Sequence, residues 1–154
     1  SFPVKSWQYG LSSLLALFHD VIITLGFFCF LGKFYDIPLT IPIITALLTI
    51  IGYSINNTVV VFDRIRENLQ KNPGKEYREI VNLSLNQTLV RSLNTSLTTL
   101  LVLFAIFFFA SPSLKYFALA LIVGISVGTF SSLFIASPIL VSWHYYLLNR
   151  KKKT

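Results

Sequence analysis

GYSINNTVVVFDRIREN (Gly52–Asn68) is the segment from which the architecture of this chain follows. Its first half is apolar apart from two adjacent amides, Asn56 and Asn57, whereas its second half carries a dense run of charge that begins at Asp63. A soluble helix would place such polar groups along one face. Here they are separated along the axis, which is typical of a helix that leaves a bilayer and enters water. The two amides lie roughly 10 Å inside that exit point, and polar groups at such a depth are costly and usually functional.

The composition of the chain is also that of a membrane protein. Of the 154 residues, 54% are hydrophobic and only 12% are charged, about half the charged share of a soluble domain. The net charge of +7 comes from basic residues at the ends of apolar segments and in one loop, so it indicates membrane topology and not nucleic-acid binding. Cys29 is the single cysteine, which excludes an intrachain disulfide. The chain contains no methionine, and we expect it to begin inside a longer protein or to be processed.

Four apolar segments are long enough to cross a bilayer. They cover about residues 7–31, 39–62, 85–110 and 114–148, and each exceeds the roughly 20 residues that a spanning helix needs. Backbone polar groups cannot remain unpaired in lipid, and none of the segments alternates as a barrel strand would. We therefore predict an all-α fold, a four-helix transmembrane bundle.

The distribution of basic residues predicts the orientation of these spans. One basic residue precedes the first span, five lie in the 63–84 connection and four in the C-terminal tail, whereas only two lie in the other connections. The positive-inside rule places both termini and the 63–84 loop in the cytoplasm. Within that loop, the run from Glu76 has helical spacing and predicts a short amphipathic helix that lies on the membrane surface and runs into the third span. A solvated linker helix is the alternative.

The last span carries a ridge of small residues at every fourth position. Its members are Ala120, Gly124, Gly128, Ser132 and Ala136. This spacing places them on one face and lets another helix backbone approach closely, so the ridge predicts helix packing more than a functional site.

The other three spans carry polar stripes, which we expect to face one another in the bundle interior. The stripes contain Asp20, the pair Asn56 and Asn57, and Arg91. An ionised Asp or Arg facing lipid would cost several kcal/mol. Each stripe also has an alternative interpretation in which it only stabilises the fold. In that case the Arg91 side chain extends to the membrane interface, and the asparagines form hydrogen bonds to neighbouring helices. Asp20 would then be neutral and hydrogen-bonded. A neutral Asp20 is also compatible with a proton relay.

No pattern in the sequence predicts an enzyme or a metal site. His19 and His144 have no metal-binding spacing, and there is no phosphate-binding glycine loop, nucleophile elbow or hydrolytic triad. His19 adjoins Asp20, but neighbours on a helix point about 100° apart, so the pair is not expected to act as a dyad. We predict no enzymatic activity and no cofactor.

Four stretches of the chain resemble one known family. They are IGYSINNTVVVFDRIREN (Ile51–Asn68), LFHDVIITLG (Leu17–Gly26), NLSLNQTLVRSLNTSLTTL (Asn82–Leu100) and IVGISVGTFSSLFIASPIL (Ile122–Leu140). They resemble the SecF branch of the SecD/SecF family of protein-export membrane proteins, which is related to proton-driven RND transporters. The SecD motif, which ends in ERIRE, fits less well. The resemblance covers nearly the whole chain and corresponds to the third to sixth spans of a six-span, RND-like membrane domain.

The resemblance implies a subunit of the SecDF accessory complex in the inner or plasma membrane. Its implied partners are SecD, the SecYEG translocon, the surrounding lipid bilayer and an exported polypeptide that an extracytoplasmic domain would handle. The implied energy source is the proton-motive force, in place of a cofactor. The alternatives are a scaffold subunit that conducts no protons itself and another RND-like transporter.

The chain departs from the family pattern at Asn57, where the family usually has an aspartate that the resemblance implicates in proton conduction. An asparagine can hydrogen-bond but cannot release a proton. The family's intramembrane arginine matches Arg91, and its His-Asp pair matches His19 and Asp20. The proton-relay candidates are thus Asp20, Arg91, Asn57, Asn56 and His19. Either Asp20 carries the proton step together with an acid of SecD, or the subunit is mainly structural.

Overall fold

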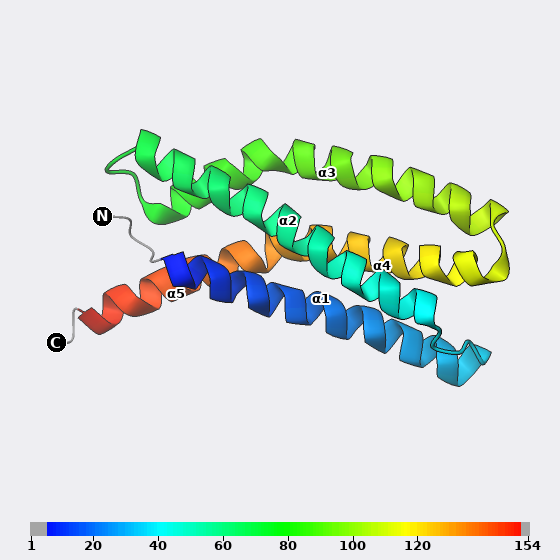
Figure 1. Ribbon diagram of the computed structural model, residues 1–154. Coiled ribbons are helices and arrows are strands. Elements are labelled where there is room, and N and C mark those ends of the chain that lie inside the picture. Colours follow the sequence, from blue (N-terminus) through cyan, green and yellow to red (C-terminus); the bar gives the residue numbers. More distant parts are fainter. Residues whose placement is uncertain (1–5, 152–154) are drawn as a thin grey trace.

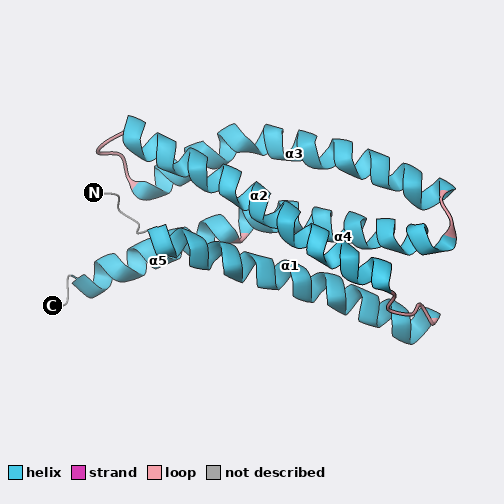
Figure 2. Ribbon diagram, viewed as in Figure 1, coloured by secondary structure: helices cyan, strands magenta, loops and turns pink. Residues whose placement is uncertain are grey.

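The computed structural model describes residues 6–151, and every regular element in that range is an α-helix (Figure 2). The helices are α1 (Ser6–Tyr35), α2 (Ile41–Lys71), α3 (Tyr77–Phe109), α4 (Pro112–Phe134) and α5 (Ala136–Lys151). Figure 1 shows an elongated bundle in which α1 to α4 run up and down, with α5 continuing from α4. Within the described range four segments are long and apolar enough to cross a membrane, with α4 and α5 forming one of them. The predicted all-α transmembrane bundle is confirmed.

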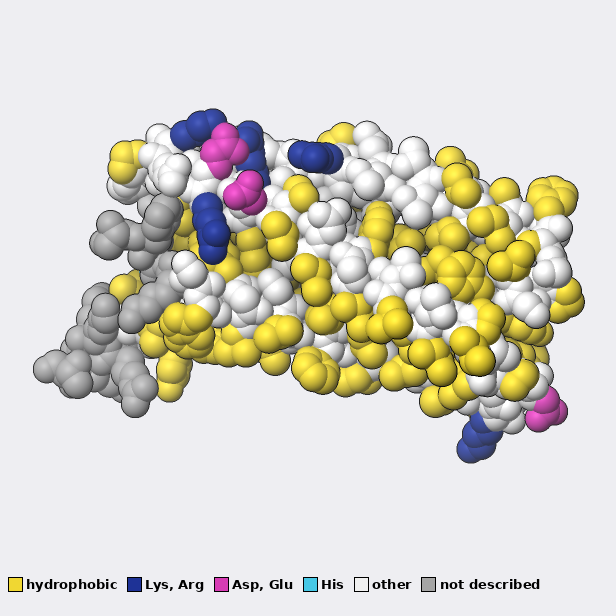
Figure 3. Space-filling model, in the orientation of Figure 1, with side chains coloured by type: hydrophobic (Ala, Val, Ile, Leu, Met, Phe, Trp, Pro, Cys, Tyr) yellow, Lys and Arg dark blue, Asp and Glu magenta, His cyan; other side chains and the backbone are white. Residues whose placement is uncertain are grey.

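The surface of the bundle has the polarity that a membrane protein needs. Large apolar side chains such as Phe18, Leu48 and Phe108 are exposed along its length. Figure 3 shows hydrophobic side chains over most of one face, with charged side chains gathered at one end and a smaller group at the other. Lys5, Lys152 and Lys153, which contribute to the predicted orientation, lie outside the described residues.

The turns between the helices use residues suited to their conformations. Asp36 follows α1 with a φ of 53°, a left-handed conformation that aspartate adopts more readily than most residues. Gly74, with a φ of 101°, lies in the turn between α2 and α3 and needs the freedom of glycine. Proline occupies the first turn of α2 and of α4, where its missing N–H leaves no intrahelical bond unmade.

The connection between α2 and α3 differs from the sequence prediction. Residues 63–84 are predicted as a loop in which a short helix from Glu76 runs into the third span, and the continuous α3 agrees with this last part. In the structure α2 continues to Lys71 and α3 begins at Tyr77, so that only residues 72–76 are outside helices. The charged run that starts at Asp63 therefore marks where the apolar segment ends but not where the helix ends.

Contacts across this hairpin stabilise the helical extensions. Asn68 Nδ2 donates to Ser84 Oγ and to Gln87 Oε1, both at 2.8 Å, and Arg64 Nε donates to Gln87 Oε1 at 2.9 Å. Ile65 is fully buried in the same region. Because these contacts join residues of both helices, tertiary packing favours the extended hairpin over a loop.

The fourth apolar segment, predicted as one span over 114–148, is interrupted at Ile135, between α4 and α5. Pro138 explains the interruption, because it has no N–H to donate to the carbonyl of Phe134 and its ring crowds that carbonyl. The Ile135 N–H still donates to the Ser131 carbonyl at 2.9 Å, and the Ile139 N–H donates to the Ile135 carbonyl at 3.1 Å. The chain therefore bends at this point without losing its helical course.

The α4 helix occupies the centre of the bundle. In the span that α4 and α5 form, 61% of the most apolar stretch is buried, against 17–33% for the other three spans. All five residues of the small-residue ridge are buried, from Ala120 to Ala136. A β-carbon at Gly124 would lie 2.1 Å from Cδ1 of the fully buried Ile50. The absence of a side chain at Gly124 is therefore what allows α2 to approach α4.

Gly124→Ala should destabilise the protein by about 1–3 kcal/mol, because Ile50 and α2 must move to admit the methyl group. The measurement is the free energy of unfolding in detergent micelles. Gly26→Ala is the matched control, since nothing lies within 4 Å of a β-carbon at that site. Equal unfolding free energies for the two variants would contradict the packing argument.

Candidate functional site

The candidate site is built around Asp20, whose side chain is fully buried near the middle of α1. Its Oδ2 accepts a hydrogen bond from Ser54 Oγ of α2 at 2.5 Å, and its Oδ1 lies 3.1 Å from His19 Nδ1. Thr24 Oγ1, one turn further along α1, donates to the Asp20 carbonyl at 2.8 Å. A buried carboxyl group is costly unless it is paired or neutral, and here both of its oxygens have a polar neighbour.

Gly128 of α4 packs beside this carboxyl group, and a β-carbon there would make only ordinary van der Waals contacts. A β-carbon at Gly128 would lie 3.5 Å from Asp20 Oδ2 and 3.4 Å from Ser54 Cβ. Asp20 therefore lies where α1, α2 and α4 meet. The small-residue ridge and the buried acid, which are separate features in the sequence, are parts of one arrangement.

The prediction that His19 and Asp20 do not pair is wrong. The His19 ring nitrogen Nδ1 lies within hydrogen-bond distance of the carboxylate, and the His19 side chain is 35% exposed while that of Asp20 is fully buried. The angle of about 100° between helical neighbours applies to their Cβ directions. Rotation of both side chains about their own bonds still brings the terminal atoms together. His19 thus links the buried acid to the surface of the bundle.

The two asparagines of α2 have different environments. Asn56 is exposed, whereas Asn57 is only 6% exposed and its Nδ2 has no hydrogen-bond partner among the described residues. Ser12 Oγ of α1 is likewise buried and without a partner in the described part of the chain. Both atoms lie between Asp20 and the end of the bundle where α1 begins. Buried polar atoms of this kind are usual sites for bound water.

The predicted arrangement of α3 is wrong. Arg91, which we predicted to face the bundle interior, is exposed on the surface of this chain, as are four other polar residues of α3, namely Gln87, Asn94, Thr95 and Thr98. Four smaller hydroxyl residues face the interior, namely Ser84, Thr88, Ser92 and Ser96. Small side chains permit close helix packing, whereas a buried guanidinium would need an acidic partner. In the described residues the Arg91 side chain makes no hydrogen bond or ion pair.

The buried hydroxyl stripe of α3 makes a second interhelical contact that our sequence analysis missed. Ser96 Oγ lies 2.6 Å from Thr129 Oγ1 of α4 and 3.1 Å from the Tyr53 hydroxyl of α2. The repeat of Ser and Thr at every fourth position from Ser84 to Ser96 is the signal that predicts this face. The structure therefore brings Asp20 and His19 together with Ser54, buries Asn57 separately, and leaves Asn56 and Arg91 on the surface.

The arrangement can hold or move a proton, but it offers little for other chemistry. Residues 6–151 contain no group of three or more His, Cys, Asp or Glu side chains that could hold a metal ion. The chemistry available at the site is transfer of a proton between Asp20 Oδ1 and His19 Nδ1, with Ser54 as a donor to the carboxylate.

Comparisons with known proteins agree on one family. The sequence profile of the C-terminal region of the protein export membrane proteins SecD/SecF matches residues 5–146. Protein translocase subunit SecF of Petrotoga mobilis is 50% identical over 148 residues, which cover 96% of this chain and 46% of that protein. SecF of Thermobaculum terrenum is 49% identical over 137 residues, covering 89% of this chain and 43% of that protein.

Solved structures of SecDF share the fold. A crystal structure of SecDF in its super-membrane-facing form has a TM-score of 0.88 and 46% identity, and the match covers 96% of this chain and 20% of that one. SecDF from Thermus thermophilus, described as a translocon-associated membrane protein, has a TM-score of 0.84 and 49% identity, with 90% and 19% covered. This chain spans less than half the length of the two SecF relatives.

Ser54→Ala should destabilise the protein by about 1–2 kcal/mol, because it removes the interhelical donor to the buried Asp20 carboxyl group. The measurement is the free energy of unfolding in micelles. Thr49→Ala is the control: Thr49 is exposed and bonds only the Thr45 carbonyl of its own helix, so its change should stay within about 0.5 kcal/mol. A Ser54→Ala protein as stable as the control would contradict a stabilising role for this bond.

Proposed function

The chain belongs to the SecD/SecF family of protein export membrane proteins, as the C-terminal membrane region of a SecF, and on this premise we propose that it serves protein export. In this proposal it supplies four membrane spans to a SecF subunit that assists export through the Sec translocon. Its relatives are named protein translocase subunits. The activity is that of the whole subunit, since this chain spans 43–46% of those relatives.

The exposed polar face of α3 supports a partner inside the membrane. Arg91, Asn94 and Thr95 are exposed beside apolar surface residues such as Val90, Leu93 and Leu97. Charged side chains within membrane-spanning segments are costly when they face lipid. We infer that this face packs against another membrane-spanning segment, with SecD as the partner. Relatives named SecDF, such as that of Thermus thermophilus, support this choice.

The buried Asp20 supports a proton step in this subunit. In the proposed step the ionised Asp20 carboxylate accepts a hydrogen bond from the Ser54 hydroxyl. It takes a proton at Oδ1 from His19 Nδ1, 3.1 Å away, and later returns the proton to the same nitrogen. His19 is partly exposed, and the unpartnered atoms of Asn57 and Ser12 offer sites for water toward the end of the bundle where α1 begins. The energy source is the proton-motive force. Asn57 itself cannot titrate.

A second candidate function is a scaffold that binds SecD and the SecYEG translocon without conducting protons. The amide at Asn57, where the resemblance expects an acid, favours this alternative. In both versions the protein lies in the inner or plasma membrane, with the α2–α3 hairpin in the cytoplasm and the exported polypeptide on the opposite side. A third candidate is that the chain is part of another RND-like transporter, in which case its variants would not change the rate of protein export.

Asp20→Asn in the full-length SecF, assembled with SecD in proteoliposomes, should lower proton uptake about tenfold or more, because the amide cannot exchange a proton. Assembly should persist, since an amide can accept the Ser54 hydrogen bond. Asp36→Asn is the matched control, because it removes an exposed carboxyl group. Proton uptake that is unchanged in Asp20→Asn would end the relay proposal and leave the scaffold.

Arg91→Leu should lower both the recovery of SecD with SecF and the rate of export, because the partner's polar groups opposite Arg91 lose their counterpart. Co-purification and an export assay in vesicles measure the two effects. Lys75→Leu, an exposed basic residue in the hairpin turn, is the control. If recovery and export both match the control, Arg91 snorkels to the interface and does not contact SecD.

A further inference from the structure

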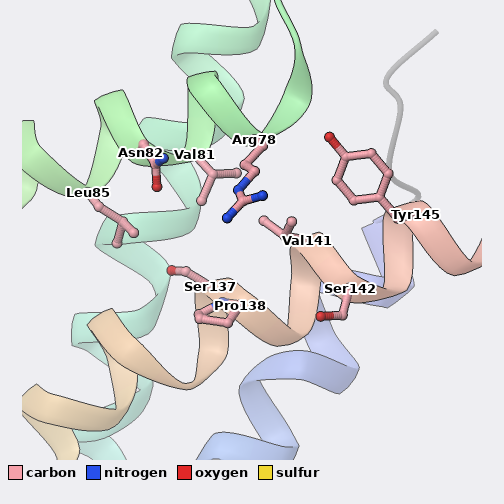
Figure 4. Close-up of a pocket in the computed structure, with 9 residues that line it drawn as sticks. All are labelled: Arg78, Val81, Asn82, Leu85, Ser137, Pro138, Val141, Ser142 and Tyr145. Atoms are coloured by element: carbon pink, nitrogen blue, oxygen red, sulfur yellow. The ribbon is translucent and has the colours of Figure 1, made fainter.

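A pocket of about 480 Å³ lies between the first turns of α3 and the α5 helix (Figure 4). Four residues of α3 and five of α5 line it, and none of them belongs to the Asp20 site. Its volume is in the range of sites that bind small molecules.

The bend at Pro138 accounts for this hollow. After Ile135 the chain turns so that α5 follows the start of α1, where the rings of Trp7 and Trp143 meet with centroids 5.3 Å apart. Figure 1 shows α5 directed away from the long axis of α3. The Tyr77 and His144 rings, 4.4 Å apart, still join α3 to α5. The space left between the two helices is the pocket.

The pocket is amphipathic. Val81, Leu85 and Val141 form apolar walls, with Pro138 beside them. Figure 4 shows the Arg78 guanidinium extending from α3 into the space between the two helices. One cation thus lies against a largely apolar surface.

The Arg78 guanidinium is available to an incoming anion. Among the described residues Arg78 forms no salt bridge, and the carboxylate of Glu76, two residues away, accepts a hydrogen bond from the Tyr145 hydroxyl. Guanidinium groups bind phosphate oxygens in a bidentate manner and are less strongly hydrated than ammonium groups. The Arg78 side chain is therefore suited to bind a phosphate group.

A second, more apolar hollow of about 540 Å³ adjoins the first. The two share Pro138 and Ser142, and the second adds Trp143 and Tyr146. Tryptophan and tyrosine at the end of a membrane-spanning helix are typical of the lipid headgroup level. The two hollows together offer a cation at that level and an apolar path along α5.

We propose that these hollows bind an anionic phospholipid, with its phosphate at Arg78 and an acyl chain along Val141, Pro138 and Trp143. Lipid is the occupant that matches both properties, because free phosphate would leave the apolar walls uncovered and an uncharged lipid would leave Arg78 unpaired. Both helices belong to segments that are long and apolar enough to cross a membrane, and the hollows lie at an end of these segments, where lipid headgroups are within reach. Basic pockets between helices are suited to such headgroups. The site does not depend on the proposed role in export.

The test uses full-length SecF with SecD, reconstituted in phosphatidylcholine vesicles that contain spin-labelled phosphatidylglycerol or spin-labelled phosphatidylcholine. The unaltered protein should immobilise phosphatidylglycerol about fivefold more strongly than phosphatidylcholine, and Arg78→Gln should reduce this preference to near one. Lys75→Gln is the matched control, because it removes one exposed charge three residues away. It should keep most of the preference.

Ser142→Trp provides a second variant that keeps the charge. Ser142 is exposed and lines both hollows, so the indole should block the acyl path and release phosphatidylglycerol even if Arg78→Gln fails to fold. The proposal is overturned by equal immobilisation of the two lipids in the unaltered protein, or by a preference that survives both variants. Displacement of the lipid by millimolar inorganic phosphate would also overturn it, since that result describes a simple anion site.

Discussion

At the centre of the bundle, α1, α2 and α4 approach one another closely enough to enclose a carboxyl group. The approach of α2 to α4 depends on Gly124, because a β-carbon there would lie 2.1 Å from Cδ1 of Ile50, whereas one at Gly128 would be in ordinary van der Waals contact with the Ser54 and Asp20 side chains. Lipid is as apolar as the helix surfaces, so association inside a membrane relies on close packing and interhelical hydrogen bonds. Gly124 allows the first, and the Ser54–Asp20 bond provides the second.

The α3 helix shows how this constraint separates interior from exterior. Its serine and threonine stripe fits against α2 and α4 and contributes the Ser96 contacts. Its larger polar residues, Arg91 among them, are consequently turned outward. A polar surface of this kind is costly in lipid, which is why we propose a membrane partner for it. On α3 the small hydroxyl side chains thus lie inside the bundle and the larger polar side chains lie outside.

Several features could be read from the sequence because they depend on short-range patterns. The apolar segments predict four spans, and the spacing from Ala120 to Ala136 predicts the packing face of α4. The extent of the α2–α3 hairpin could not be read in this way, because its helices continue past the apolar residues through contacts such as Asn68 to Ser84. Pro138 does signal the division of the last span, but the apolar run on both sides of it favours one continuous segment.

The sequence by itself determined the class of protein, the number of spans and the family, since hydropathy, charge and short motifs are properties of the chain alone. Only the tertiary structure decided which polar groups meet. Helical periodicity places Ser96 and Arg91 on two different faces of α3, yet it does not say which face points inward. That choice depends on the rotation of each helix about its axis. The contact of His19 with Asp20 depends on side-chain rotation as well, which the pattern of residues along a helix does not determine.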